Sequence, residues 1–320
     1  MHFMIFLWGF TAILGVLLSI TAIEVVFYRT LIATVGTGLL ILILQVRRQP
    51  PRFDGSDPAS LLERYPFLLP RDTGGRTDWK RILTFTGIGG VIGIHWLSFF
   101  GGAKVANASV CLAGIATASL WTAFIEPLFQ RKAIKWFEIM LGCIVVVGLY
   151  VIFYFEFGNR NYMMGLGLGI LAAFLAAVFS SLNSLYAKKY HHYTITMYEM
   201  FGACLTSLVG MVLYENLTET SLTWIPSDPM DWLWLLILGG ACTVYAYSVS
   251  VELLQRITVF TMNLSINLEP LYGIAMAALI FNENEQLTTQ FYIGAGIVIT
   301  AVFVHPLFQR WEKRRKLAQT

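Results

Sequence analysis

One apolar segment in the second half of the chain places the strongest constraint on the fold. Residues 258–281 are long and apolar enough to cross a bilayer, yet they carry Glu269 and Pro270 near the middle. A charged side chain at the centre of a membrane helix costs at least about 2.5 kcal/mol. Proline also removes an intrahelical hydrogen bond, and freed backbone at this depth is tolerated where protein buries it or a water-filled cavity meets it. The segment is therefore predicted to border a polar path through the membrane.

The polar side chains of this segment fall on two nearly opposite faces. At about 100° per residue, Ser265, Glu269 and Tyr272 share one face of a regular helix. Asn263 and Asn267 lie almost opposite. All five are candidates for lining a solute pathway. Unless the proline twists the helix, Glu269 and the two asparagines cannot all meet one solute.

The rest of the chain is similarly apolar. Its 320 residues are 57% hydrophobic and only 13% charged, whereas soluble domains contain about 25% charged residues. The sequence therefore predicts an integral membrane protein of the all-α class, because open sheets leave backbone groups unsatisfied in lipid. At about 20 residues per span, we expect ten transmembrane helices. Their expected starts lie near Phe3, Glu24, Arg81, Val105, Ile134, Met163, Thr194, Trp232, Thr258 and Gln290.

The longest polar interruption is residues 47–80, which hold five of the ten prolines. This stretch is too polar to span a membrane. Its sequence is compatible with disorder or with a short surface helix around residues 59–65, and a tolerated loop insertion is the simplest interpretation. The four cysteines fall within predicted spans and lack the spacing of metal ligands. We expect no cofactor, no metal site and no catalytic residues.

Basic residues are distributed very unequally between the two sides of the predicted membrane. If the N-terminus is cytoplasmic and the spans alternate, all but three of the 22 Lys and Arg residues fall within or beside cytoplasmic segments. The exceptions are Arg29 inside a span and Lys104 and Arg160 outside. This bias predicts that both termini are cytoplasmic. The net charge of +3 then reflects contact with the anionic leaflet of the lipid bilayer, and no nucleic-acid partner is expected.

The two halves of the chain resemble each other. An offset of 152 residues aligns Gly87 with Gly239, Lys104 with Arg256, Ser109 with Thr261 and Gly142 with Gly294. A weaker second match places Arg29 on Glu199, and for it chance similarity between apolar helices is a serious alternative. Each half, residues 1–157 and 158–320, contains five predicted spans, so the halves must have opposite orientations in the membrane. Inverted repeats are a hallmark of secondary transporters, with the binding site at the repeat interface.

Three stretches of the chain carry a resemblance to a known family. They are FLWGFTAILGVLL at the start, FYRTLIA in the second span, and NLEPLYGIAMAALIFNENEQLTTQFYIGAGIVITAVF in the second half. Together they are similar to the EamA-type branch of the drug/metabolite transporter superfamily. The first copy departs from the second, since Ala118 stands where the second has Pro270. The resemblance implies a ten-helix carrier of small metabolites, often amino acids or related solutes, in a bacterial inner membrane.

Ionisable residues within spans are the first functional candidates. Glu269 is the deepest acidic residue. If it alternates between protonated and charged forms, it would couple solute movement to protons; the alternative is a carboxylate paired with a basic residue or capped by backbone donors. Arg29 suits an anionic group of a solute, although it is also close in sequence to Glu24. Glu199 is the counterpart of Arg29 in the second half.

A second group of candidates is aromatic or carries an amide. It comprises His95 and Trp96 in the third predicted span, Tyr245 and Tyr247 in the eighth, and Asn183 and Tyr186 in the sixth. Aromatic residues at matching depth in inverted copies would wall a central cavity around an apolar or cationic solute. The alternative is that they pack between helices or anchor the protein at the membrane interface.

These observations predict a secondary transporter of small organic metabolites that works by alternating access. Export of an amino acid or a related metabolite is the leading expectation, driven either by a proton gradient or by the gradient of the solute. One alternative is an intramembrane enzyme acting on lipids, but the sequence contains no HExxH or GxSxG motif. Another is a scaffold or sensor subunit, which would not need polar residues at mid-membrane.

Overall fold

The computed structural model describes residues 1–47, 58–72, 74–106, 108–152, 160–218, 222, 224–281 and 289–317. Within these ranges the regular structure is helical, and the only β contact is an isolated bridge between Arg71 and Thr77. The all-α class predicted from the sequence is therefore confirmed.

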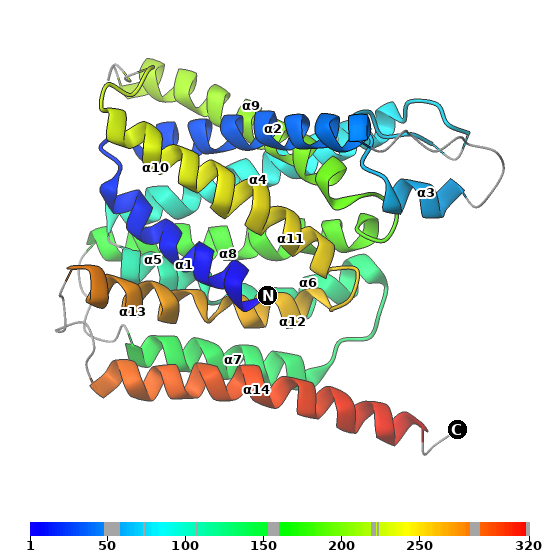
Figure 1. Ribbon diagram of the computed structural model, residues 1–320. Coiled ribbons are helices and arrows are strands. Elements are labelled where there is room, and N and C mark those ends of the chain that lie inside the picture. Colours follow the sequence, from blue (N-terminus) through cyan, green and yellow to red (C-terminus); the bar gives the residue numbers. More distant parts are fainter. Residues whose placement is uncertain are drawn as a thin grey trace.

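The helices form one bundle of roughly parallel and antiparallel rods (Figure 1). In chain order they are α1 (His2–Leu17), α2 (Ala22–Arg47), α3 (Pro58–Arg64), α4 (Trp79–Val105), α5 (Ala108–Ile115), α6 (Ala118–Gln130), α7 (Trp136–Ile152), α8 (Arg160–Tyr186), α9 (His192–Thr218), α10 (Pro229–Gly239), the π-helical turn η2 (Gly240–Tyr245), α11 (Ala246–Leu253), α12 (Val259–Ile266), α13 (Glu269–Phe281) and α14 (Thr289–Leu317).

Six helical segments of the described chain are long and apolar enough to cross a membrane. They comprise α2, α4, most of α8, α9, α10 through α11, and the central part of α14. Two shorter apolar helices, α1 and α7, accompany them. Large apolar side chains such as Val147, Leu213, Leu236 and Phe303 are exposed on the bundle, as expected for a surface that faces lipid. The chain is thus a multi-pass membrane protein.

Two of the expected spans are each divided into two short helices. Residues 116–117 separate α5 from α6, and residues 267–268 separate α12 from α13. In the second pair, Pro270 occupies the first turn of α13, where its missing N–H leaves no hydrogen bond unmade. In the first pair, the Thr117 hydroxyl donates to the Gly114 carbonyl oxygen at 2.8 Å across the interruption.

The tightest crossing in the bundle lies between α4 and α9. A Cβ atom added at Gly89 would lie 2.1 Å from the carbonyl oxygen of Glu199, and one added at Gly202 would lie 2.0 Å from that of Thr86. Only glycine permits so close an approach of two helix backbones. Beside this crossing, α8 packs on α4 and α2 packs on α9. Elsewhere in the bundle, α14 packs on α7 and α13 on α1.

The polar stretch between α2 and α4 is part of the fold where it is described. Its α3 helix, Pro58–Arg64, confirms the short helix expected around residues 59–65; residues 48–57 lie outside the described chain. The side chains of Leu62 and Phe67 are buried. The Thr194 hydroxyl at the start of α9 donates to the Phe67 carbonyl oxygen at 2.9 Å. This stretch therefore covers one end of the bundle, at the right of Figure 1.

Candidate functional site

A cavity of about 100 Å³ lies inside the bundle, and side chains from both halves of the chain form its wall. Both helix interruptions border it. Ile115 and Ala118 flank the first interruption, Ile266 and Glu269 flank the second, and all four line the cavity. Interrupted helices of this kind expose backbone to a cavity rather than to lipid. The cavity is therefore the candidate binding site.

The second interruption changes which polar residues meet. α12 ends at Ile266 and α13 begins at Glu269, so the two helices do not share one periodicity. As a result Asn263 and Glu269, which a regular helix would place on nearly opposite faces, both line the cavity. Asn267 instead donates from Nδ2 to the Ser119 Oγ at 3.1 Å and is not part of the wall.

Arg29 brings a buried positive charge to the cavity wall. Its Nε donates to the Thr243 Oγ1 at 2.7 Å, and its guanidinium carbon lies 4.2 Å from the ring centre of Trp96, a cation–π contact. Glu269 lies on the same cavity wall, close enough for the two charges to act on each other. Glu24, the neighbour in sequence, caps its own helix instead, because its Oε2 accepts from the Thr21 backbone N–H at 2.7 Å.

The π-helical turn η2 positions one partner of Arg29. There the Thr243 hydroxyl donates to the carbonyl oxygen of Leu238, five residues earlier, at 2.8 Å. π-Helical turns are rare and are frequently found at functional sites. The turn holds the Thr243 oxygen where it accepts the hydrogen bond from Arg29.

His95, Asn183 and Tyr247 form a second polar part of the wall. The Nδ1 of His95 lies 2.7 Å from the Ala172 carbonyl oxygen. Since a carbonyl only accepts, this nitrogen carries the proton. The Nδ2 of Asn183 donates to the Tyr247 hydroxyl oxygen at 3.0 Å. Asn183 and Tyr247 both also donate to a carboxylate oxygen of Glu199, which lies behind them.

Asn263 ties three helices together at the cavity. Its Nδ2 donates to the Thr122 Oγ1 at 2.7 Å and to the Ser180 Oγ at 3.0 Å, which joins α12 to α6 and α8. Asn263 and Ser180 both line the cavity. This amide therefore holds the polar wall in place, and its carbonyl oxygen remains a candidate acceptor for a solute.

Two residues expected beside Glu269 do not line the cavity. The Ser265 hydroxyl donates to the Thr261 carbonyl oxygen of its own helix at 2.8 Å. The Tyr272 hydroxyl lies 3.1 Å from the Nδ1 of His2. The interruption between α12 and α13 explains the difference for Ser265, because the two helices are no longer in register.

Two aromatic candidates also lie away from the cavity. Tyr245 is 47% exposed and its ring lies 5.9 Å from that of Phe3. Positions two residues apart on a helix point in opposite directions, so Tyr245 and Tyr247 cannot both face one cavity. Tyr186 lies near the end of α8, where the Arg81 guanidinium carbon is 5.1 Å from its ring centre.

The cavity wall also contains residues that sequence reasoning did not single out. Trp8, Thr11, Phe99, Phe179 and Ser180 are among them. Ser180 could have been predicted, because it lies three residues before Asn183 in the same predicted span and so shares its helix face. The aromatic residues carry no comparable signal, because aromatics in membrane helices commonly pack between helices.

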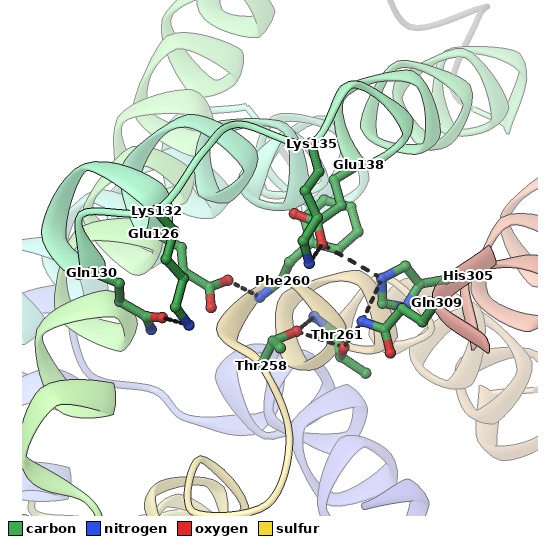
Figure 2. Close-up of polar contacts among 10 residues, drawn as sticks. All are labelled: Glu126, Gln130, Lys132, Lys135, Glu138, Thr258, Phe260, Thr261, His305 and Gln309. Carbon is green, nitrogen blue, oxygen red and sulfur yellow. Dashed lines mark hydrogen bonds and ion pairs between the residues drawn. The ribbon is translucent and has the colours of Figure 1, made fainter. Parts of the chain in front are cut away.

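A separate polar cluster joins the ends of α6, α7, α12 and α14 (Figure 2). The Glu126 Oε2 accepts from the Phe260 backbone N–H at 2.8 Å, which caps the first turn of α12. The Glu138 Oε1 lies 3.0 Å from the Lys135 Nζ and 4.0 Å from the His305 Nε2. These contacts connect the first half of the chain to the second at one end of the bundle.

The helices that supply most of the cavity wall can be compared with known proteins. Residues 163–305 match the EamA-like transporter family. The match runs from α8 into α14 and includes Asn183, Tyr247, Asn263 and Glu269 of the cavity wall. It confirms the resemblance recognised in the sequence, and over these residues the chain is similar to a family of membrane transporters.

A solved structure shares the fold of nearly the whole chain. It is titled only "Crystal structure of protein", and its TM-score with this chain is 0.68 over 96% of this chain and 95% of the other, at 15% sequence identity. At that identity the similarity shows the fold alone. No curated protein matches the chain significantly.

Proposed function

We propose that this protein is a secondary transporter that carries an amino acid or a related zwitterionic metabolite, as an exporter, by alternating access. One observation carries the proposal. Arg29 and Glu269, a cation and an acid, lie on the wall of one small cavity enclosed largely by apolar and aromatic side chains. A solute with one positive and one negative group complements this pair.

The arrangement of donors supports a carboxylate next to Arg29. The Nε of Arg29 is taken by Thr243, and no described residue accepts from its two Nη groups. Guanidinium groups bind carboxylates through two parallel hydrogen bonds. An ammonium group would then face Glu269, with the rings of Trp8, Trp96 and Phe99 around it for cation–π contact.

The size of the cavity supports a small solute. Its volume of about 100 Å³ is well below the roughly 300–1,000 Å³ of sites for drug-sized ligands. The lining is mostly apolar with a few convergent polar groups, which is the usual composition of small-molecule sites. These features favour a metabolite of amino-acid size over a lipid or a large drug.

Helix packing supports two inverted five-helix units, residues 1–157 and 158–320. α4 packs on α8 and α9, and correspondingly α10 and α11 pack on α1, and α10 on α2. Gly89 of α4 meets the backbone of Glu199, while an added Cβ at Gly239 of α10 would lie 3.3 Å from the carbonyl oxygen of Arg29. In each unit a glycine of one helix thus approaches the backbone of Arg29 or Glu199, which supports comparable places for these two residues, although the sequence alignment pairs Gly239 with Gly87 and not with Gly89.

The distribution of basic residues supports a cytoplasmic C-terminus, and in the proposed arrangement both termini lie in the cytoplasm of a bacterium, with the helices in its inner membrane. In Figure 1, α3 and the C-terminal end of α14 lie at the same end of the bundle. The polar stretch around α3 and the C-terminal segment contain most of the basic residues, and the positive-inside rule assigns such an end to the cytoplasm.

The test is counterflow in liposomes that contain the purified protein. Vesicles loaded with one unlabelled amino acid at a time receive the labelled form outside. We expect exchange of at least one zwitterionic amino acid and none of its decarboxylated or N-acetylated derivative. Arg29→Gln and Glu269→Gln should each abolish this exchange.

Arg81→Gln is the matched control, because Arg81 pairs with Asp78 away from the cavity, and its exchange should equal that of the wild type. Wild-type protein that exchanges no amino acid, or that exchanges the derivatives equally well, would contradict the proposed substrate class.

A further inference from the structure

A buried carboxyl group lies directly behind the cavity wall. Glu199 of α9 is fully buried. Its Oε2 accepts hydrogen bonds from the Tyr247 hydroxyl at 2.8 Å and from the Asn183 Nδ2 at 3.2 Å. Tyr247 and Asn183 both line the cavity. A single layer of side chains therefore separates this carboxyl group from the solute space.

The second oxygen of this carboxyl group has no partner. Among the described residues, neither the Glu199 Oε1 nor the Asn183 Oδ1 has a hydrogen-bond partner. Both atoms are acceptors when the carboxyl group is ionised, and each lacks a donor. A proton on the Glu199 Oε1 would turn that oxygen into a donor and remove the buried charge. The two oxygens of Glu199 are thus in unlike surroundings, one with two donors and one with none.

No ion pair with Glu199 is found in the part of the chain that the structure describes. The charged or titratable side chains of the cavity wall in front of it are Arg29 on α2, His95 on α4, Tyr247 on α11 and Glu269 on α13. Of these, only Tyr247 forms a hydrogen bond or ion pair with Glu199 among the described residues. On α4 the nearest contact to the Glu199 backbone is Gly89, which has no side chain to offer.

The other buried acid of the site has different surroundings. Glu269 shares the cavity wall with Arg29, whose charge acts on it, so a cation partly offsets its negative charge. An unpaired buried charge is far more costly than a paired one. Ionisation is therefore more costly for Glu199 than for Glu269, which makes Glu199 the stronger candidate for a group that alternates between protonated and charged forms.

We propose that Glu199 is the residue that carries the coupled proton, and that Glu269 binds solute. This inference rests on the transport function proposed above. In the neutral state the proton is on the Glu199 Oε1. When the Asn183 and Tyr247 side chains admit water from the cavity, the O–H bond breaks and the proton leaves as hydronium. The remaining carboxylate is stabilised by the two donors at Oε2, and the reverse step takes up one proton from the other side.

The first test uses Glu199→Gln in proteoliposomes. The amide resembles the protonated acid in shape and carries a donor, but it cannot release a proton. We expect amino acid counterflow to persist and accumulation driven by a pH gradient to be lost. Glu252→Gln is the control, because Glu252 is partly exposed at the end of α11 and pairs with Arg256 at 3.7 Å; it should accumulate solute like the wild type.

Accumulation by Glu199→Gln equal to that of the wild type would overturn the proposal. So would wild-type accumulation driven by a sodium gradient and not by a pH gradient.

A second readout does not depend on transport. Infrared spectra of the purified protein in lipid nanodiscs, without solute at neutral pH, should contain the C=O stretching band of a protonated carboxyl that Glu199→Gln lacks. Absence of that difference would overturn Glu199 as the proton carrier even if the wild type transports amino acids. If the band is present but the wild type transports nothing, the proposed transport function and the coupling role of Glu199 are both overturned. The result would still establish that Glu199 is a buried, protonated acid.

Discussion

Gly89→Ala should destabilise the protein strongly, because α4 and α9 cross with their backbones almost in contact. The added Cβ would lie 2.1 Å from the Glu199 carbonyl oxygen, 2.7 Å from its carbonyl carbon and 2.8 Å from its Cα. All three atoms belong to the backbone of a helix, so no side-chain rotation relieves the overlap. The crossing itself must open.

The size of the effect follows from that distance. Real Cβ atoms essentially never approach closer than 3.0 Å, so the helices must separate by about 0.9 Å at this point. Overpacking of a close-packed interior costs about 1–3 kcal/mol, and a backbone obstacle places this site at the upper end. Alanine returns about 0.5–1 kcal/mol of helix stability relative to glycine. The net loss in unfolding free energy is therefore about 2 kcal/mol.

The same helix offers a matched control. An added Cβ at Gly87 meets no atom within 4 Å, so Gly87→Ala should gain about 0.5–1 kcal/mol from helix propensity alone. Melting of the purified variants in detergent, followed by intrinsic tryptophan fluorescence, compares them directly. We expect Gly89→Ala to melt at least about 4 °C below the wild type and Gly87→Ala to melt at or above it.

Gly202→Ala tests the same crossing from the opposite helix, since its Cβ would lie 2.0 Å from the Thr86 carbonyl oxygen. It should lose as much stability as Gly89→Ala. If both variants melted with the wild type, the two helices would not cross at these glycines, and the placement of Glu199 next to the cavity would lose its structural basis.

Three further predictions concern topology and the site. A reporter active only in the cytoplasm should work when fused to the C-terminus and be silent at Asn216; activity at both positions would refute the orientation. Glu269→Gln should abolish counterflow itself, unlike Glu199→Gln. If Glu269→Gln instead lost pH-driven uptake and kept normal counterflow, Glu269 would be the residue that carries the coupled proton. Trp96→Leu removes the cation–π contact with Arg29, worth about 1–2 kcal/mol, so the apparent affinity in counterflow should fall roughly 5–30-fold, and unchanged affinity would rule out that contribution.

The sequence was sufficient for the membrane class and indicated a disturbed backbone beside Glu269, at Pro270. Both follow from single-residue energetics, because a carboxyl group and a proline within an apolar run have few tolerated environments. The meeting of Asn263 with Glu269 could not be predicted in the same way. Helical periodicity assumes one continuous helix, and the two-residue break between α12 and α13 removes that assumption.

The surroundings of Glu199 were also beyond sequence reasoning. Its two donors come from α8 and α11, 16 and 48 residues away in the chain, and only tertiary packing brings them together. The stretch between α2 and α4 presented the same difficulty. Its prolines and charges indicated a loop, whereas its main-chain carbonyl groups bind α9 through Thr194 and Tyr198.

That stretch constrains how the cavity can open. The Pro66 carbonyl oxygen accepts from Gln45 of α2 at 3.0 Å, and that of Phe67 accepts from Thr194 of α9. Asp78, at the start of α4, accepts from the hydroxyl of Tyr190, two residues before α9, at 3.1 Å, so α2, α4 and α9 are joined at this end. The Figure 2 cluster joins α6, α7, α12 and α14 in the same way. If each group moves as one body, the sliding surface runs between two bodies that each combine helices from both halves of the chain. The linker between the two sequence halves would then be a poor place to look for the hinge.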